Sequence, residues 1–505
     1  MNIKMIRYII GRLLLVESAL MLLPFGIALI YGEFAQLHSF LIPMGILAIL
    51  GALSVAFKPK DQTLKAKDGF VTVGLSWIVL SLFGCLPFVI SGLIPNFVDA
   101  FFETVSGFTT TGASVLYAED FDKLRAPANA AIGMRGVFFW RSFTNWIGGM
   151  GVLVFVLAVM PQQDMKSSRL VHVMRAEMPG PKVDKIVSTV KKTSAIMYGI
   201  YAVMTTVLTV MLLFGGLDFY EALCTAFATA GTGGFSIWAD SMVTFGGNGV
   251  ALEYCTWVVA IFMFLFAVNF NVYFLMLTGK IFSAIFSEEL IWFTGMVLAA
   301  TAFITYNLCS TGTVDSVGDG LRYAFFQVTT IVSTSGFATD DFNLWPTATK
   351  TLLLVLMFVG ACAGSTGGGM KVSRLVIAFK SAIAEIKHMG RPRQVKRIRF
   401  EHKPVENDTI KGVLAFMVAY VFIFIASFLI IAIADGQSIE TSFSAVASCL
   451  NNIGPALDKA GPMSNYDAAF ANPISKIVLS LDMLLGRLEL FPIIMLFSPS
   501  VWREK

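Results

Sequence analysis

Four short stretches of this chain carry hydroxyl groups, amides and glycines where a membrane-buried segment would be apolar. Aligned without gaps on one glycine each, they are T-T-T-G-A at 109–113, G-T-G-G-F at 231–235, S-T-S-G-F at 333–337 and N-N-I-G-P at 451–455. Backbone carbonyl groups in such loops can replace the hydration shell of a monovalent cation. Irregular backbone at membrane depth is tolerated only where it lines a wet cavity or is buried in protein. The pattern therefore predicts four polar loops around one axis that line an ion path.

The residues expected to line this path are the aligned glycine of each polar loop and the two residues before it. They are Thr110, Thr111 and Gly112; Thr232, Gly233 and Gly234; Thr334, Ser335 and Gly336; and Asn452, Ile453 and Gly454. Glycine allows the backbone φ values that turn carbonyl groups inward. A helix that ends at the path presents its partially negative carboxyl end there, which favours a cation over an anion. A single threonine-glycine loop is commonly a packing site, so the prediction depends on the four copies.

The rest of the chain has the composition of a polytopic membrane protein. Of its 505 residues, 56% are apolar and only 14% are charged, which does not suit soluble domains. Ten apolar runs approach or exceed the roughly 20 residues that cross a bilayer. These runs cover residues 8–31, 40–57, 70–94, 138–160, 193–214, 254–277, 290–308, 351–379, 410–434 and 474–497. Four shorter runs, at 97–108, 219–230, 321–332 and 439–450, each precede a polar loop and are predicted to be half-helices that enter the membrane and turn back.

The order helix, half-helix, loop, helix recurs four times, in a unit of roughly a hundred residues. The expected units are two extra N-terminal membrane helices at 1–65 and pore repeats at 66–170, 171–285, 286–400 and 401–505. Because each repeat contains two full crossings, all four loops enter from the same side and can close around a central pore. Two inverted halves would instead place broken segments in opposite orientations. The predicted fold class is therefore an all-α polytopic membrane protein with four parallel helix, pore-loop, helix repeats.

Basic residues set the expected orientation of this fold. They concentrate before the first repeat at 58–67, between the first and second at 166–192, and between the third and fourth at 380–403. Connecting segments rich in lysine and arginine face the cytoplasm. Both termini and the linkers between repeats are therefore expected in the cytoplasm, and the polar loops open outward.

Two anomalies interrupt the apolar runs. Residues 360–369 contain five glycines, and each costs a helix roughly 1 kcal/mol relative to alanine, so run 351–379 is expected to break into a loop. A phosphate-binding motif is not met, because Met370 separates the glycines from Lys371; packing glycines are the alternative.

Arg487 lies inside run 474–497 and should face protein or water, unless it snorkels to the interface. Glu489 lies two positions later on another face, and Arg141 is expected to be an anchoring charge.

With these motifs in hand, the chain resembles the potassium uptake proteins of the TrkH, TrkG and KtrB superfamily, most closely the TrkH branch. The resemblance covers essentially the whole chain and its two extra N-terminal helices. Its most specific marks are the four polar loops, G-S-T-G-G-G-M-K at 364–371 and G-R-L-E at 486–489. The resemblance implies that Gly112, Gly234, Gly336 and Gly454 are the filter glycines, and glycine rather than serine at the first of them implies selectivity for potassium. The fourth loop departs most from a threonine-rich filter.

The resemblance also implies a gate. In the family, the glycine-rich loop lies under the filter and obstructs the path until it moves, and the matching arginine is a positive barrier beside it. Carried to this chain, the gate residues are Gly364, Ser365, Thr366, Gly367, Gly368, Gly369, Lys371 and Arg487. The hypothesis is that Arg487 and residues 360–371 form one gate.

The family further implies potassium uptake across a bacterial inner membrane, as a homodimer embedded in membrane lipid. It implies a soluble nucleotide-binding subunit of the TrkA type on the cytoplasmic side. The basic stretch 387–403 is either a docking surface for that subunit or only a sign of orientation. Potassium is the expected transported ion, and neither an organic cofactor nor nucleic acid is expected in this chain.

Two other classes of function compete with a channel-like pore. A transporter coupled to protons or sodium would need buried acidic residues, for which Glu17, Glu103 and Glu221 are the candidates. An enzyme would need a nucleophile, a base or a metal set at usable spacing, and the sequence offers none. The chain is therefore not expected to be an enzyme, and coupled transport remains the alternative.

Overall fold

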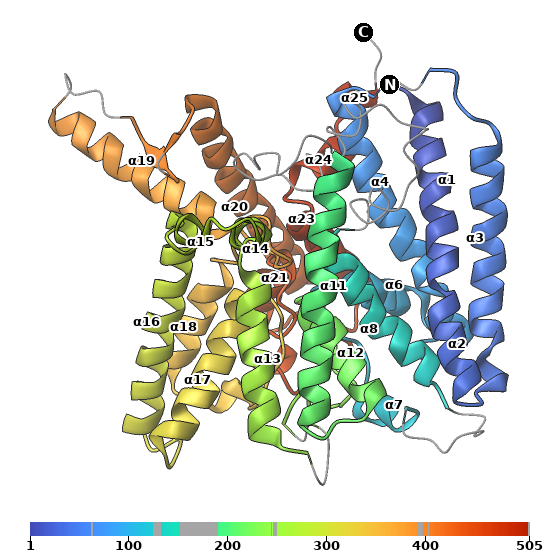
Figure 1. Ribbon diagram of the computed structural model, residues 1–505, viewed down its shortest axis with the longest axis horizontal. Helices are drawn as coiled ribbons and strands as arrows, with labels where there is room; N and C mark the ends of the chain where they lie inside the picture. The colour runs from blue at the N-terminus through green and yellow to red at the C-terminus, as the bar shows by residue number, and fades with distance from the viewer. Residues whose placement is uncertain are drawn as a thin grey trace.

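The fold is built almost entirely from helices, most of which run along one common direction (Figure 1). This computed structural model describes every residue except 62–63, 125–132, 152–189, 244, 246–249, 392–396, 402 and 503–505. The helices before the first repeat are α1 (Ile3–Leu20), α2 (Leu22–Ile30), η1 (Phe34–Gln36) and α3 (His38–Ala56). The start of α1 lies at the same end of the molecule as α25 and α19, and α7 lies at the opposite end (Figure 1).

The first two expected repeats contain one half-helix each. The first repeat holds α4 (Ala66–Gly84), α5 (Leu86–Ile90), α6 (Phe97–Phe108), α7 (Ala118–Asp122) and α8 (Arg135–Gly149). The second holds α11 (Val190–Phe214), α12 (Phe219–Ala230), α13 (Leu252–Ala267), α14 (Phe270–Leu277) and α15 (Ile281–Ile285). The expected boundary at 170–171 and the basic linker up to residue 189 lie outside the described residues.

The last two expected repeats follow the same order. The third holds α16 (Glu288–Ser310), α17 (Val317–Val332), η3 (Phe342–Leu344), α18 (Thr347–Met357) and α19 (Val372–Gly390). An antiparallel pair of short strands, β1 (Arg399–Phe400) and β2 (Lys403–Pro404), leads to the fourth. The fourth holds α20 (Asn407–Asp435), α21 (Ile439–Leu450), η4 (Asp458–Ala460), α22 (Tyr466–Ala469), α23 (Pro473–Arg487), α24 (Phe491–Phe497) and α25 (Pro499–Trp502).

The predicted half-helices are confirmed as separate short helices. Three of them, α6, α12 and α21, have the predicted bounds. The fourth, α17, begins four residues earlier than predicted, at Val317 rather than Leu321. The reason is a cap, because the Ser316 hydroxyl accepts the backbone N–H of Asp319 and starts the helix there.

The predicted spans are less continuous than the sequence indicated. Among the described residues, six helices are long and apolar enough to cross a membrane. They are Ile3–Ile30, Phe34–Ala56, Lys67–Ile90, Ser194–Phe214, Glu288–Ser310 and Asn407–Asp435. The predicted break in run 351–379 is confirmed, since α18 ends at Met357 and α19 begins at Val372. Run 474–497 is also split, at Glu489 and Leu490, whose φ angles are 55° and 67°. Run 138–160 is described only as far as residue 151.

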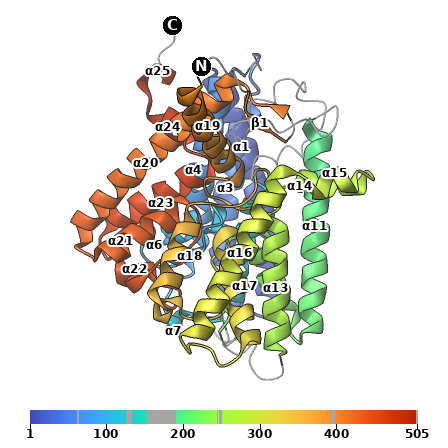
Figure 2. The ribbon, with the colours of Figure 1, turned by 90° about the vertical axis from the view of Figure 1, so that its left-hand side faces the viewer.

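The prediction of one continuous span over 254–277 is wrong. It consists of α13 and α14, bent by 88°, so that α14 and α15 lie across the end of α13 (Figure 2). The Asn269 side chain caps α14 by accepting the N–H of Asn271 at 2.9 Å. The backbone groups freed at the bend bind the glycine-rich loop, residues 360–371: Phe270 N–H donates to the Gly364 carbonyl, and Cys362 N–H donates to the Ala267 carbonyl. The bend therefore forms a seat for that loop.

Candidate functional site

The four polar loops share one backbone conformation. In each of them, the residue two places before the aligned glycine has a left-handed backbone conformation, which is uncommon for residues other than glycine. The φ angles are 55° at Thr110, 54° at Thr232, 61° at Thr334 and 56° at Asn452. The glycines follow with φ angles of 83°, 65°, 84° and 102°. The repeat seen in the sequence is thus also a repeat of backbone geometry.

The same hydrogen bond closes the end of each half-helix. The residue before the aligned glycine donates its N–H to a carbonyl five residues earlier, the closure found where a helix ends in a left-handed residue. The four bonds are Thr111 to Ser106 at 2.8 Å, Gly233 to Ala228 at 2.9 Å, Ser335 to Thr330 at 2.8 Å and Ile453 to Ser448 at 2.9 Å. Each loop is therefore fixed to its own half-helix before it meets its neighbours.

The aligned glycines show how the four loops meet. A Cβ atom on Gly112 would lie 2.3 Å from the Gly233 carbonyl oxygen, and one on Gly234 would lie 2.0 Å from that of Ser335. A Cβ atom on Gly336 would lie 2.0 Å from the Ile453 oxygen, and one on Gly454 would lie 2.5 Å from the Thr111 oxygen. Each loop thus approaches the next, and the fourth returns to the first. The predicted path residues are brought together in one closed ring, and only glycine fits at its four contact points.

The fourth loop departs from the others in its side chains, as its sequence indicated. The Asn452 side-chain amide donates to the Thr111 hydroxyl at 3.0 Å and to the Met483 carbonyl at 2.8 Å. In the first and third loops, hydroxyls pair within the loop instead, Thr109 with Thr111 and Ser333 with Ser335, both at 2.8 Å. Asn452 therefore ties the fourth loop to the first and to α23.

The glycine-rich loop lies against the ring at the left-handed residues, two places after the end of each half-helix. Gly368 N–H donates to the Thr334 hydroxyl at 2.7 Å, and the Thr232 hydroxyl donates to that of Thr366 at 3.4 Å. A Cβ atom on Gly368 would lie 2.8 Å from the Asn452 side chain. The predicted gate loop thus touches three of the four polar loops.

Arg487 lies against the glycine-rich loop. Its guanidinium donates to the carbonyl oxygens of Thr366 and Gly149, both at 2.6 Å, and also to that of Gly148. Glu489 pairs with Arg374 instead, which agrees with the expectation that it is a poor partner for Arg487. The carbonyls of Gly148 and Gly149, at the end of α8, are contacts that the sequence analysis missed. Arg487 therefore bridges the glycine-rich loop and the first repeat.

Glu289 is a further residue that the sequence analysis missed. Its buried carboxylate accepts the N–H of Ala363, within the glycine-rich loop, at 2.8 Å. Lys371 closes the other end of the loop, where its ammonium group donates to the Gly367 carbonyl. The loop is therefore held by side chains at both ends.

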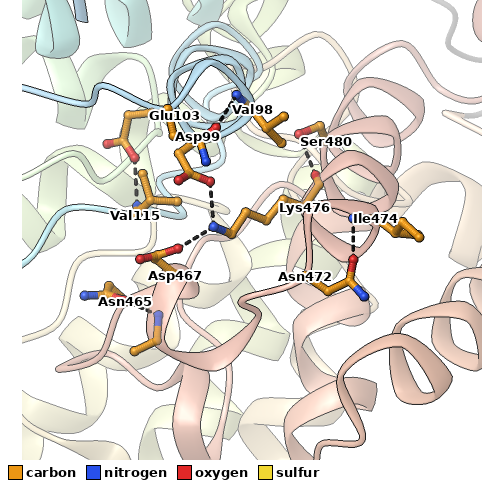
Figure 3. Close-up of polar contacts among 12 residues, drawn as sticks. Val98, Asp99, Glu103, Val115, Asn465, Asp467, Asn472, Ile474, Lys476 and Ser480 are labelled. Carbon is orange, nitrogen blue, oxygen red and sulfur yellow. Dashed lines mark hydrogen bonds and ion pairs between the residues drawn. The ribbon is translucent and has the colours of Figure 1, made fainter. Parts of the chain in front are cut away.

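The interpretation of Arg141 as an anchoring charge is wrong. Arg141 is buried, pairs with buried Glu103 at 2.7 Å and donates to the Ser236 carbonyl at 2.7 Å. The second oxygen of Glu103 accepts Val115 N–H at 2.9 Å (Figure 3). This pair therefore joins the segments that leave the first and second polar loops, and Arg141 neutralises the charge of Glu103.

We expect Arg141→Met to destabilise the protein by about 3–5 kcal/mol, because it leaves the Glu103 carboxylate buried without its ion pair. The measurement is thermal unfolding of the detergent-purified protein. Arg322→Met is the matched control, because Arg322 pairs at 2.8 Å with Asp319, whose side chain is 44% exposed. This substitution should shift the melting temperature little. Equal melting temperatures for the two variants would contradict this account of the pair.

Polar contacts also join the other neighbouring repeats outside the ring. Met242 N–H donates to the Ala338 carbonyl at 3.0 Å between the second and third. Asp458 N–H donates to the Asn343 side chain at 2.9 Å between the third and fourth. The hydroxyls of Thr441 and Ser438 donate to the Asp458 carboxylate and hold its pKa below the ordinary value.

The fourth repeat is joined to the first by a buried lysine. Lys476 on α23 pairs with Asp99 of the half-helix α6 at 2.5 Å and with Asp467 of α22 (Figure 3). Asp467 also accepts the Tyr117 hydroxyl at 2.6 Å. The ring is therefore braced between every pair of neighbouring repeats.

Comparison with known proteins places the chain in a family. The family model TrkH, described as a cation transport protein, matches residues 38–504. The Trk system potassium uptake proteins TrkH of Salmonella typhimurium and of Escherichia coli K12 are each 34% identical, with all of both chains covered. TrkG of Escherichia coli K12 is 31% identical over 100% of this chain and 99% of its own. The crystal structure of the potassium transporter TrkH from Vibrio parahaemolyticus superposes with a TM-score of 0.86 at 31% identity, with all of both chains covered.

These matches agree with the fold predicted from the sequence, an all-α polytopic membrane protein, and with a role in transport rather than catalysis. The chain therefore belongs to the TrkH family of cation transport proteins.

Proposed function

We propose that this protein takes up potassium through a channel-like pore whose selectivity filter is the ring of four polar loops. The observation that carries the proposal is the closed cycle of contacts from each aligned glycine to a carbonyl of the next loop. Carbonyls and hydroxyls gathered in this way can replace the water shell of a dehydrated cation. The filter residues are the twelve that the sequence analysis named. The TrkH and TrkG relatives are potassium uptake proteins, which supports potassium as the transported ion.

The proposed gate is the glycine-rich loop together with Arg487. The loop hydrogen-bonds to Thr334 and Thr232 at the inner end of the filter, where a cation leaving it must pass. Arg487 holds the loop through the Thr366 carbonyl and places a positive charge beside the same point. A fixed positive charge near the path repels a passing cation. Opening therefore requires the loop to leave the filter and Arg487 to release its carbonyls.

A cytoplasmic regulatory subunit of the TrkA type is the proposed source of that movement. The short strands β1 and β2, at the end of the basic stretch 387–403, are linked to the gate through two carboxylates. Glu401 accepts the N–H of Glu289 at 3.0 Å, and the Glu289 carboxylate holds Ala363 of the glycine-rich loop. A partner that displaced this pair of strands would pull on the loop. Residues 392–396 and 402 of the stretch lie outside the described part.

The proposed setting is the bacterial inner membrane, with both termini in the cytoplasm and the polar loops opening outward. The basic linkers between the repeats support this orientation. A homodimer with one pore in each protomer is proposed from the family resemblance.

Proton- or sodium-coupled transport is the second candidate, and one buried carboxylate favours it. Asp482 on α23 accepts the Ser427 hydroxyl at 2.7 Å with one oxygen, and its other oxygen has no partner among the described residues. It is adjacent to Met483, whose carbonyl holds Asn452 of the fourth polar loop. The sequence analysis did not name Asp482. Glu103, one of the acidic candidates from the sequence, forms an ion pair with Arg141.

Uptake of radioactive rubidium into liposomes that contain the purified protein tests both candidates. A channel-like filter predicts uptake that is driven by an inside-negative membrane potential and needs no proton or sodium gradient. The potential supplies a driving free energy of about 2.3 kcal/mol per charge for each 100 mV. Potassium should compete with rubidium and sodium should not. Uptake that needs a pH or sodium gradient would favour coupled transport. Uptake no faster than in protein-free liposomes, both for the unmodified protein and for Arg487→Ala, in which the proposed gate is weakened, would contradict both candidates.

A further inference from the structure

The four filter glycines differ in what their carbonyl groups do. The Gly454 carbonyl accepts two hydroxyls, that of Ser448 and that of Tyr466, each at 2.7 Å. Within the described residues, the carbonyls of Gly112, Gly234 and Gly336 accept no hydrogen bond from the protein. A carbonyl oxygen has two lone pairs, so two donors occupy it fully. At this level of the filter, the protein holds one of the four carbonyls and, within the described residues, donates no hydrogen bond to the other three.

The two hydroxyls come from different parts of the fourth repeat. Ser448 lies in the last turn of the half-helix α21, whose end is fixed to the polar loop by Ile453 N–H. Tyr466 begins α22, twelve residues after Gly454, and its side chain is buried. The Gly454 carbonyl is thus clamped between the half-helix that leads into the loop and the segment that leaves it.

Tyr466 is itself held by the first repeat. Its backbone N–H donates to the Ser114 carbonyl at 2.8 Å, directly after the first polar loop. Its ring lies 5.5 Å from the ring of Phe102 on α6, centroid to centroid. The next residue, Asp467, pairs with the buried Lys476 of α23. The Tyr466 hydroxyl is therefore a rigid donor, positioned by contacts on both sides of the junction between the fourth and first repeats.

From this geometry, we propose that Tyr466, together with Ser448, is a positioning residue that sets the selectivity of the filter for potassium over sodium. This inference rests on the proposed filter function. Sodium is the smaller ion, so a filter accommodates it by drawing its loops inward. The clamp on Gly454 fixes the fourth loop, whose Ile453 and paired asparagines provide none of the threonine hydroxyls of the other loops. Without the clamp, the fourth loop can move toward the axis and admit sodium.

The test is Tyr466→Phe, which removes the hydroxyl and keeps the ring that packs on Phe102. The readout is the concentration of sodium, relative to potassium, that halves rubidium uptake into liposomes. Loss of one buried hydrogen bond predicts that the discrimination against sodium falls roughly fivefold. Ser448→Ala removes the other hydroxyl from the same carbonyl and should lower discrimination in the same direction.

The matched control is Tyr117→Phe, since the Tyr117 hydroxyl binds Asp467 in the same segment but touches no filter carbonyl. It should keep the discrimination of the unmodified protein. If Tyr466→Phe and Ser448→Ala both retain discrimination within about twofold, the inference is overturned while the proposed filter stands. Equal losses in Tyr466→Phe and Tyr117→Phe would also overturn it, because the effect would then belong to the whole segment. If the unmodified protein does not discriminate potassium from sodium, the proposed function itself fails.

Discussion

Gly336→Ala is expected to lower rubidium uptake by roughly a hundredfold while the protein still folds in the membrane. Gly336 has a φ of 84°, and a Cβ atom there would lie 2.0 Å from the backbone oxygen of Ile453. Strain of about 3 kcal/mol at such a position corresponds to roughly a hundredfold in an equilibrium constant. The overlap is with backbone, so it is relieved only if the third and fourth polar loops separate. The ring then opens at one of its four contacts.

The matched control is Gly295→Ala in the middle of α16, where an added Cβ would meet nothing within 4 Å. It makes the same chemical change in a helix that does not reach the ring, and it should leave uptake unchanged. The amounts of folded protein are compared by size-exclusion chromatography and thermal unfolding. Full uptake with unchanged rejection of sodium in Gly336→Ala would contradict the claim that the contact is part of the filter.

Arg487→Ala is expected to raise basal cation flux, measured without any partner, by at least about tenfold. Two unit charges 4 Å apart interact by about 4 kcal/mol at the dielectric constant typical near a protein surface. The substitution removes that repulsion and also frees the Thr366 carbonyl, through which Arg487 holds the glycine-rich loop. Both effects favour the open path. Flux is measured as rubidium uptake into liposomes at a fixed membrane potential.

Arg487→Lys separates charge from geometry in this prediction. Lysine keeps the positive charge, but a single ammonium group cannot reproduce the planar fork that reaches Thr366, Gly148 and Gly149 together. Its basal flux should lie between those of the unmodified protein and Arg487→Ala. Basal flux in Arg487→Ala equal to that of the unmodified protein would contradict the barrier role.

The half-helices and the polar loops could be predicted closely from the sequence. A short apolar run followed by hydroxyl residues and glycine is a local pattern, and it ends a helix wherever it occurs in this chain. The bounds of α6, α12 and α21 were therefore predictable, and α17 was missed by one turn because its cap at Ser316 precedes the apolar run. The break in run 351–379 was equally local, since its glycines weaken the helix whatever they touch.

The bend after α13 and the long-range contacts of the site could not be predicted in the same way. Asn269 and Asn271 interrupt an apolar run only slightly. The bend is stabilised by backbone bonds to residues 362 and 364, almost a hundred positions later. The partners of Arg487, Arg141 and Gly454 also come from other repeats or other helices. Such pairings depend on how the four repeats are arranged around the axis. That arrangement depends on many long-range contacts together, and no local pattern in the sequence shows them.

The most direct test of the central claim is to locate the ion. Crystals of the protein grown with rubidium in place of potassium would show its anomalous scattering. The account predicts rubidium on the axis of the ring, surrounded by the twelve filter residues. These form four groups of three, which end at Gly112, Gly234, Gly336 and Gly454. Rubidium bound elsewhere in the membrane-spanning part, with none inside the ring, in a preparation that transports rubidium would contradict it.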